Sequence, residues 1–227
     1  MTMNVISYFD AIPDLEFSKQ SEDILSIWTD TWKRHGWNPI ILEHEMAKKN
    51  KLYHQLDLDN PQANFYKTIH ESMWKYHKTC YCRLLAYCEY VRNNGATLYA
   101  DYDVINYGFT PDIIKNIEHD SYLCIHRSVM FLGLTGIDDI ERVILKFNNE
   151  PFSEGDERGS CNDLNVMRKY TKVFKSKLMP SGDWYTTYIE PNFRNNSPLV
   201  HYDGGCYKRG ISRSMTRVDI IKKHNRI

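Results

Sequence analysis

A short apolar run that ends in two acids constrains this chain more than any other feature. Residues 96–100 read Ala-Thr-Leu-Tyr-Ala, and Asp101 and Asp103 follow with only Tyr102 between them. Such a run is typical of a buried central strand. Successive side chains of a strand point to opposite faces, so a chain that stays extended through Tyr102 would place both carboxylates on one face. Open α/β sheets bind their ligands at that carboxyl edge.

Two neighbouring carboxylates repel each other and are costly to desolvate. A hard divalent cation with phosphate oxygens as further ligands would relieve both costs, so the pair predicts a magnesium or manganese site. Asp-x-Asp alone is a weak signal, because it also occurs on solvated turns. Residues 57–59 of the same chain read Asp-Leu-Asp and precede Asn-Pro. Acids at that position cap a helix, with Pro61 as the first helical residue, so we interpret this second pair as capping.

Size and charge narrow the class of protein. A chain of 227 residues predicts one domain with a substantial core. Lys and Arg number 29, as do Asp and Glu, so no overall field attracts nucleic acid. The Met-Thr-Met-Asn start is unlike a signal peptide, and no segment has the length of a membrane span. Cys80, Cys82 and Cys88 lack the spacing of a zinc site, so we expect a soluble, cytoplasmic protein with reduced cysteines.

The first forty residues predict a βαβ unit. Residues 5–9 form a short apolar strand, a helical pattern follows, and residues 39–42 form the next strand. The ligand of such a unit lies near the end of the first strand, which makes Ser7, Tyr8 and Phe9 candidates for binding a nucleotide base and ribose. Neither Gly-x-Gly-x-x-Gly nor a Walker loop follows, so the phosphates must be held in another way.

A second helical pattern, at residues 81–92, leads into the acid-ended strand through Asn-Asn-Gly, a C-terminal capping sequence. Arg83 stands near the start of this helix, where the helix dipole disfavours a cation. A phosphate or an acid of the metal site would explain it, and a solvated surface arginine is the alternative. Further strands and a helix are expected within residues 121–147, and the acidic, irregular residues 150–159 suit a loop over a site.

Two candidates lie further along the chain. Asp163 opens a helical pattern and can be either an N-cap or a functional acid. His201 ends a short apolar strand and precedes a glycine-rich turn with Lys208 and Arg209. A lone histidine is usually structural, but one followed by flexible backbone and cations suits a third metal ligand beside a diphosphate.

These segments together resemble the GT-A glycosyltransferases, in particular small bacterial and viral members whose sugar-binding region contains Asp-x-Asp. The arginine-bearing helix, the glycine turn and the acid-ended strand occur in the family's order, from Arg83 to Asp103. His201 and the basic residues after it are similar to the closing histidine motif. One departure is Asn94, where the family usually has glycine; a left-handed backbone position accepts asparagine.

The resemblance implies an α/β fold, a Rossmann-like single domain with a mixed, mainly parallel central sheet flanked by helices. Residues 1–108 would form the nucleotide-binding half and residues 109–227 the acceptor-side half. The implied activity is metal-dependent transfer of a sugar from a nucleoside-diphosphate sugar, with a UDP-sugar favoured. Asp103 and His201 would bind Mn²⁺ or Mg²⁺, while Asp101 would hold ribose or sugar hydroxyls and reach the metal.

The resemblance also implies the remaining site residues. Asp163 takes the place of an acceptor-facing acid, a general base in an inverting enzyme or an orienting group in a retaining one. Asp101 is the other candidate catalytic acid. The residues expected to contact the nucleotide sugar are Ser7, Tyr8, Phe9, Tyr81, Arg83, Asp101, Tyr102, Lys208 and Arg209.

The acceptor stays open at this point: a nucleic-acid base of a virus or phage, a glycan or a protein. Binding to DNA would require a local basic patch in the tail from Lys208 to Arg226. Two other functions also stay open. A nucleotidyl- or phosphotransferase could use the acids for two metals, and a binding module could hold a nucleotide sugar without turnover.

Overall fold

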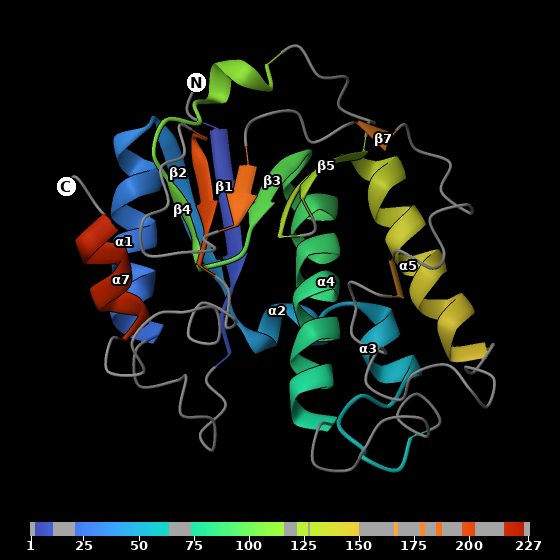
Figure 1. Ribbon diagram of the computed structural model, residues 1–227. Helices are drawn as coiled ribbons and strands as arrows, with labels where there is room; N and C mark the ends of the chain where they lie inside the picture. Colours follow the sequence, from blue (N-terminus) through green and yellow to red (C-terminus); the bar gives the residue numbers. More distant parts are fainter. Residues whose placement is uncertain are drawn as a thin grey trace.

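The computed structural model describes residues 3–10, 21–63, 74–115, 122–126, 128–149, 166–167, 178–179, 185–187, 197–202 and 216–224. A six-stranded sheet in the order β2-β1-β3-β6-β5-β7 crosses the centre of the molecule, and a three-stranded sheet, β4-β9-β8, lies beside it (Figure 1). The strands are β1 (Met3–Tyr8), β2 (Trp37–Leu42), β3 (Thr97–Ala100), β4 (Val104–Asn106), β5 (Tyr122–His126), β6 (Val129–Leu132), β7 (Leu178–Met179), β8 (Tyr185–Thr187) and β9 (Leu199–His201).

Five of the six central strands run in one direction. β1 is parallel to β2 and to β3, and β5 is parallel to β7, whereas β6 is antiparallel to both β3 and β5. The helices are α1 (Ser21–Arg34), α2 (His44–Lys48), α3 (Lys51–Gln55), α4 (Trp74–Asn94), α5 (Leu134–Asn149) and α7 (Arg217–His224), with a 3-10 turn at Pro111–Ile113. The prediction of a mixed, mainly parallel sheet flanked by helices is confirmed.

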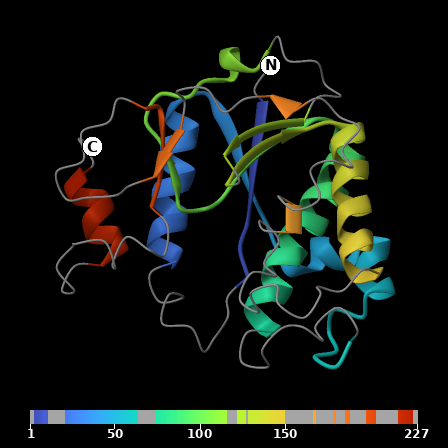
Figure 2. The same cartoon turned by 45° about the vertical axis from the view of Figure 1, so that its right-hand side comes forward.

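Each face of the central sheet packs against its own set of helices. Consecutive residues of β1 point to opposite faces of the sheet: Val5 belongs to one apolar cluster and Ile6 to another. The cluster of Val5 contains Trp28 and Trp32 of α1 together with apolar residues of α7. The cluster of Ile6 contains residues of α2, α3, α4 and α5. In two views α1 and α7 stay on one side of the sheet, and α4 and α5 on the other (Figures 1 and 2).

Two helices end at the glycine residues where the sequence predicted their ends. Gly36 follows α1 with a φ of +86°, and Gly95 follows α4 with a φ of +85°. Both values fall in the left-handed region that glycine adopts at little cost, so each helix stops there and the next strand begins. α4 begins at Trp74, earlier than the predicted residue 81, because residues 74–80 contain neither glycine nor proline to interrupt it. No helix in the described part of the chain is long and apolar enough to span a membrane.

The two acids stand where the chain leaves one sheet and enters the other. β3 ends at Ala100, and β4 of the smaller sheet begins at Val104. The amide of Val104 donates to the carbonyl of Asp101 at 2.9 Å, which closes a turn. The extended path through Tyr102, the condition under which both carboxylates would share one face of a strand, is therefore not present. Pairing of β4 with a distant strand of the smaller sheet forces the turn, and a pattern of neighbouring residues does not encode that pairing.

The other Asp-x-Asp pair lies in a turn after α3. Pro61 also belongs to a turn, so the helix predicted to begin there does not begin at that residue. Asp57 has a φ of +51°, and Asp59 accepts a hydrogen bond from the Tyr53 hydroxyl at 2.7 Å. Asp59 also forms an ion pair with Lys78 of α4. Asp59 therefore ties α3 to α4, and neither acid caps a helix at Pro61.

Candidate metal and nucleotide site

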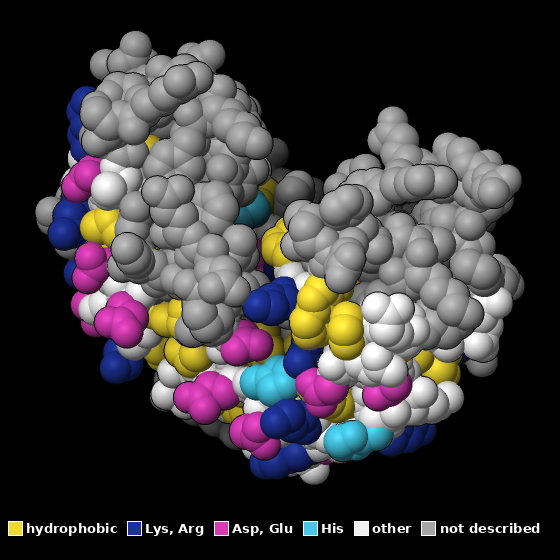
Figure 3. Space-filling view, turned by 90° about the horizontal axis from the view of Figure 1, so that it is seen from below, with side chains coloured by type: hydrophobic (Ala, Val, Ile, Leu, Met, Phe, Trp, Pro, Cys, Tyr) yellow, Lys and Arg dark blue, Asp and Glu magenta, His cyan; other side chains and the backbone are white. Residues whose placement is uncertain are grey.

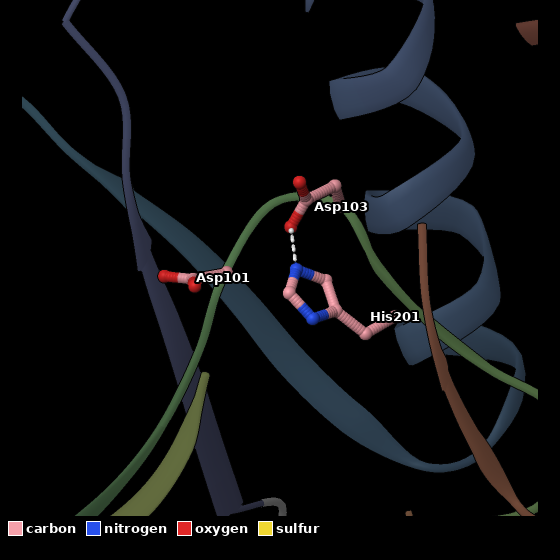
Figure 4. A group of neighbouring side chains, drawn as sticks. All are labelled: Asp101, Asp103 and His201. Atoms are coloured by element: carbon pink, nitrogen blue, oxygen red, sulfur yellow. Dashed lines mark ion pairs between the residues drawn. The ribbon is translucent and has the colours of Figure 1, made fainter. Parts of the chain in front are cut away.

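Three predicted metal ligands meet at the carboxyl edge of the central sheet. Ligand atoms of Asp101, Asp103 and His201 all lie within 4.8 Å of one another, and no second group of this kind occurs among the described residues. The imidazole Nε2 of His201 lies 3.2 Å from Oδ1 of Asp103. In Figure 4 these two side chains point toward each other, while the Asp101 carboxylate lies to one side of them.

Backbone pairing explains why residues a hundred positions apart meet here. β4 and β9 are antiparallel with Val104 opposite His201, which sets the histidine next to Asp103. The amide of Tyr202 donates to the carbonyl of Asp103 at 2.9 Å. The indole of Trp32 on α1 donates to the carbonyl of Val104 at 3.1 Å. The turn that carries the acids is thus fixed by a distant strand and by a helix.

Asp101 is held by two donors. Arg83 Nη1 and the hydroxyl of Tyr99 donate to its Oδ1 at 2.8 and 2.6 Å. Its own amide donates to the carbonyl of Ser128 at 2.8 Å. Of the two interpretations of Arg83, the one in which it binds an acid of the site fits this geometry. Charge-assisted hydrogen bonds of this length orient a carboxylate strongly.

Asp103 is held by an arginine that the sequence analysis missed. Arg217, the first residue of α7, donates from Nη1 to Oδ2 of Asp103 at 2.9 Å and is only 3% exposed. The same guanidinium donates to the carbonyl of Tyr202 and the hydroxyl of Tyr102. Burial opposes ionisation of Asp103, but His201 and Arg217 together hold the pKa of its carboxyl below the ordinary value. A cation at the first residue of a helix is a signal that could have pointed to Arg217, whereas Arg83, singled out for that reason, lies inside α4, nine residues after Trp74.

His201 is oriented through its other ring nitrogen. Nδ1 lies 2.6 Å from the hydroxyl of Tyr185 and 3.5 Å from the hydroxyl of Ser128. Burial raises the pKa of Tyr185, which keeps the phenol protonated. In the tautomer whose Nδ1–H donates to the Tyr185 hydroxyl, Nε2 carries the lone pair that a metal-ligating histidine needs.

These donors fit a small divalent cation. Mg²⁺ and Mn²⁺ take oxygen and nitrogen ligands at roughly 2.1 Å in an octahedron, so neighbouring ligand atoms stand roughly 3 Å apart. The measured separation of 3.2 Å between His201 Nε2 and Asp103 Oδ1 matches that spacing. The second oxygen of Asp103 faces Arg217, so Oδ1 is the atom placed for an ion.

The predicted nucleotide-contact residues divide into two groups. The ring of Phe9 meets that of Tyr102 edge to face at 5.6 Å, and both are partly exposed beside the acids. Ser7 is fully buried, and Tyr8 is 4% exposed with its hydroxyl near Asp10 and His44. These two residues support the site from within the sheet, because the flanking helices cover both faces of β1.

Tyr81, which was also predicted to contact the nucleotide sugar, lies in a different environment. Its side chain has no exposed surface, and its ring stacks on that of Phe147 at 6.1 Å between α4 and α5. The structure therefore places the Tyr81 side chain in the core between α4 and α5. Asp163, Lys208, Arg209 and the loop at residues 150–159 lie outside the described residues.

The carboxyl ends of β1 and β2 also carry charged surface. Viewed from below, acidic, basic and histidine side chains gather on this face of the molecule (Figure 3). The ion pairs of the described residues include Asp10 with His44, next to the ends of β1 and β2, and Asp59 with Lys78 of α4. Burial lowers the pKa of His44, with Lys78 acting in the same direction. The face beside the acids is therefore polar and mixed in charge.

No family model and no curated protein sequence matches this chain. Among solved structures it is similar to the crystal structure of a glycosyltransferase involved in the glycosylation of the major capsid of PBCV-1. The two are 11% identical with a TM-score of 0.50, over 98% of this chain and 98% of that one. This is the GT-A fold. An active-site mutant of LgtC is 12% identical with a TM-score of 0.46, over 89% of this chain and 88% of that one. The structural match to the capsid-modifying glycosyltransferase shows the fold alone at 11% identity, so the activity has to be argued from the site.

Proposed function

We propose that this protein is a metal-dependent glycosyltransferase that moves a sugar from a nucleoside-diphosphate sugar to an acceptor. The observation that carries the proposal is the convergence of Asp101, Asp103 and His201 at the carboxyl edge of a GT-A sheet. Ligands of open α/β sheets bind at this edge. The donor set of two carboxylates and one imidazole suits Mn²⁺ or Mg²⁺.

The residues of the site would have different roles in activating the sugar donor. Asp103 Oδ1 and His201 Nε2 would hold the ion, which when bound neutralises charge on the leaving diphosphate. The Arg83 guanidinium, fixed at 2.8 Å from Asp101, adds positive charge to the same region. Glycosyl transfer passes through a transition state with oxocarbenium character. Stabilisation of the leaving group should therefore affect turnover more than donor affinity.

The donor that we favour is a UDP-sugar. Phe9 and Tyr102 offer a partly exposed aromatic edge beside the acids, against which a planar base can pack. Asp101 would hold ribose or sugar hydroxyls through the oxygen that does not face Arg83. Lys208 and Arg209 stay candidates for binding the diphosphate, and Asp163 for a base or an orienting acid toward the acceptor.

For the acceptor we favour a glycan or a protein. The equal numbers of basic and acidic residues provide no general attraction to nucleic acid. The structurally similar glycosyltransferase is involved in the glycosylation of a capsid, which supports the same choice as an analogy.

A donor-hydrolysis assay tests the proposed function. Purified protein would be incubated with UDP- and GDP-sugars in the presence of Mn²⁺, and the released nucleoside diphosphate would be measured. We expect release with at least one donor, and loss of it in His201→Gln but not in Asp57→Asn, an exposed acid away from the site. Pyrophosphate or phosphoryl products would identify a nucleotidyl- or phosphotransferase instead. Donor binding without any product on long incubation would identify a binding module.

A further inference from the structure

Both acids of the site already have a cation of their own. Arg83 forms an ion pair with Asp101 at 2.8 Å, and Arg217 forms one with Asp103 at 2.9 Å. Among the described residues these four charges cancel in pairs. Repulsion between the two carboxylates, from which the sequence pattern predicted a metal, is thus relieved before any ion enters.

Arg217 is held at Asp103 by further contacts. Besides Asp103 it donates to the carbonyl of Tyr202 at 3.2 Å and to the hydroxyl of Tyr102 at 3.2 Å. Its guanidinium also lies over the Tyr102 ring, 5.7 Å from the centroid. The residue after it, Val218, and two further residues of α7 belong to the apolar cluster around α1. The positive charge is therefore a fixed part of the site.

We propose that Arg217 is a resident cation that makes divalent-ion binding at Asp103 depend on the diphosphate of the donor. The proposal deepens the proposed function and rests on it. A doubly charged ion on Oδ1 of Asp103 would share one carboxylate with the guanidinium on Oδ2, and the two cations repel each other at that range. The negative charges of a diphosphate offset the repulsion. Ion and nucleotide then bind cooperatively, each strengthening the other by the same factor.

A simpler role would be that Arg217 only orients the Asp103 carboxylate. The two roles predict opposite changes in affinity for the ion alone. Loss of an orienting hydrogen bond weakens ion binding, whereas loss of a fixed positive charge strengthens it. Repulsion of a divalent ion by an adjacent buried charge exceeds the cost of ordering one side chain, so charge decides the sign.

Substitutions that keep or remove the charge separate these roles. Arg217→Lys keeps a cation, and Arg217→Met removes it while filling similar volume. The matched control is Arg92→Met, which removes another arginine from a largely buried carboxylate, Glu141, at 2.7 Å on the α4–α5 side of the molecule. Circular dichroism and thermal melts would establish that each variant is folded.

The measurement is Mn²⁺ binding, by the electron paramagnetic resonance signal of the free ion, with and without UDP. In the unsubstituted protein and Arg92→Met we expect UDP to tighten Mn²⁺ binding at least about tenfold, or about 1.4 kcal/mol. In Arg217→Met we expect Mn²⁺ alone to bind at least about tenfold more tightly, with a smaller effect of UDP. Arg217→Lys should bind Mn²⁺ alone as the unsubstituted protein does.

The outcomes distinguish this inference from the proposed function. If the unsubstituted protein binds Mn²⁺ equally well with and without UDP, or if Arg217→Met binds it no more tightly, the role of Arg217 is refuted and the metal site stands. If no protein binds Mn²⁺ under either condition, the proposed function itself fails. Should Arg217→Met not fold, Arg217→Gln takes its place in the same measurement, because glutamine removes the charge and keeps an amide donor for the Asp103 carboxylate.

Discussion

The chain contains Asp-x-Asp twice, and the two copies differ in burial and in their place in the fold. Asp57 and Asp59 are exposed in a turn after α3. Asp101 and Asp103 are each 8% exposed, at the end of a central strand. The sequence spacing is identical, so it cannot be the spacing that makes a site.

The two pairs of acids differ in the residues that hold them and in how far those residues are buried. Asp59 pairs with Lys78 at the surface, where the carboxylate side chain is 59% exposed. Asp103 pairs with Arg217, where the two side chains are 11% and 4% exposed. Water screens the first pair, whereas the second depends on its protein partners for the stability of its charge. What distinguishes the acids of the candidate site is that they are buried and are held by side chains from distant parts of the sequence.

The largest expected effect separates the two copies by activity. Asp103→Asn preserves shape but removes a charged ligand, so we expect donor hydrolysis to fall at least about a thousandfold. Asp59→Asn should retain activity within about twofold, because water screens its charge. Release of nucleoside diphosphate measures both. Asparagine is preferable to alanine here, since its amide oxygen can still accept the hydrogen bond from Arg217, which alanine cannot. Equal losses in the two variants would mean that the pairs do not differ in function.

The second prediction compares the two ion pairs by stability. Arg217→Met leaves a buried carboxylate without its cation, so the free energy of unfolding should fall by about 3–5 kcal/mol. Lys78→Met at the exposed pair should cost about 0–1 kcal/mol. Urea denaturation followed by circular dichroism gives both values. A cost below about 1 kcal/mol for Arg217→Met would place its pair in the same class as the surface pair.

The local elements of the fold were predictable because their signals are local. In α1, Glu22 and Asp23 stand in the first turn and Lys33 and Arg34 in the last, and Gly36 ends the helix. The apolar strands on either side of α1 are short and bounded, so the βαβ unit could be predicted from the sequence.

The site was predictable only in part, because its decisive contacts are not local. The two acids and His201 were found by residue type and by their place at strand ends. Arg217, which binds Asp103 from 114 residues away, was not found. Whether the chain stays extended through Tyr102 could not be read from the sequence for the same reason, since pairing of β4 with β9 decides it. No periodic pattern within the sequence of β4 or of β9 indicates that these two strands pair.

A third prediction concerns the tyrosine beside each histidine. Tyr185 contacts His201 at 2.6 Å, and Tyr53 contacts His44 Nε2 at 2.8 Å near the exposed acids. Tyr185→Phe removes the group that orients a metal ligand, so Mn²⁺ affinity measured with UDP should fall about tenfold or more. Tyr53→Phe, the matched control, should leave it unchanged. If both variants bind Mn²⁺ normally, His201 does not need its tyrosine partner to act as a ligand.

The smallest expected effect is on the pH dependence of stability. The pKa of Asp103 is held below its ordinary value, so the folded state binds fewer protons there than the unfolded chain. Its contribution to stability is complete above the unfolded pKa of about 3.9 and is lost as the pH falls through the lower folded value.

Asp59 is also shifted downward: desolvation opposes the shift, and hydrogen bonds from Lys78 and Tyr53 outweigh it. Because that carboxylate is exposed, solvent discounts its contribution. Between about pH 4 and pH 2, Asp103→Asn should therefore lose less stability than the unsubstituted protein, and Asp59→Asn should follow the unsubstituted protein closely. Urea midpoints across this range measure the difference. Parallel curves for all three proteins would mean that the buried ion pair stores no more electrostatic stability than the exposed one.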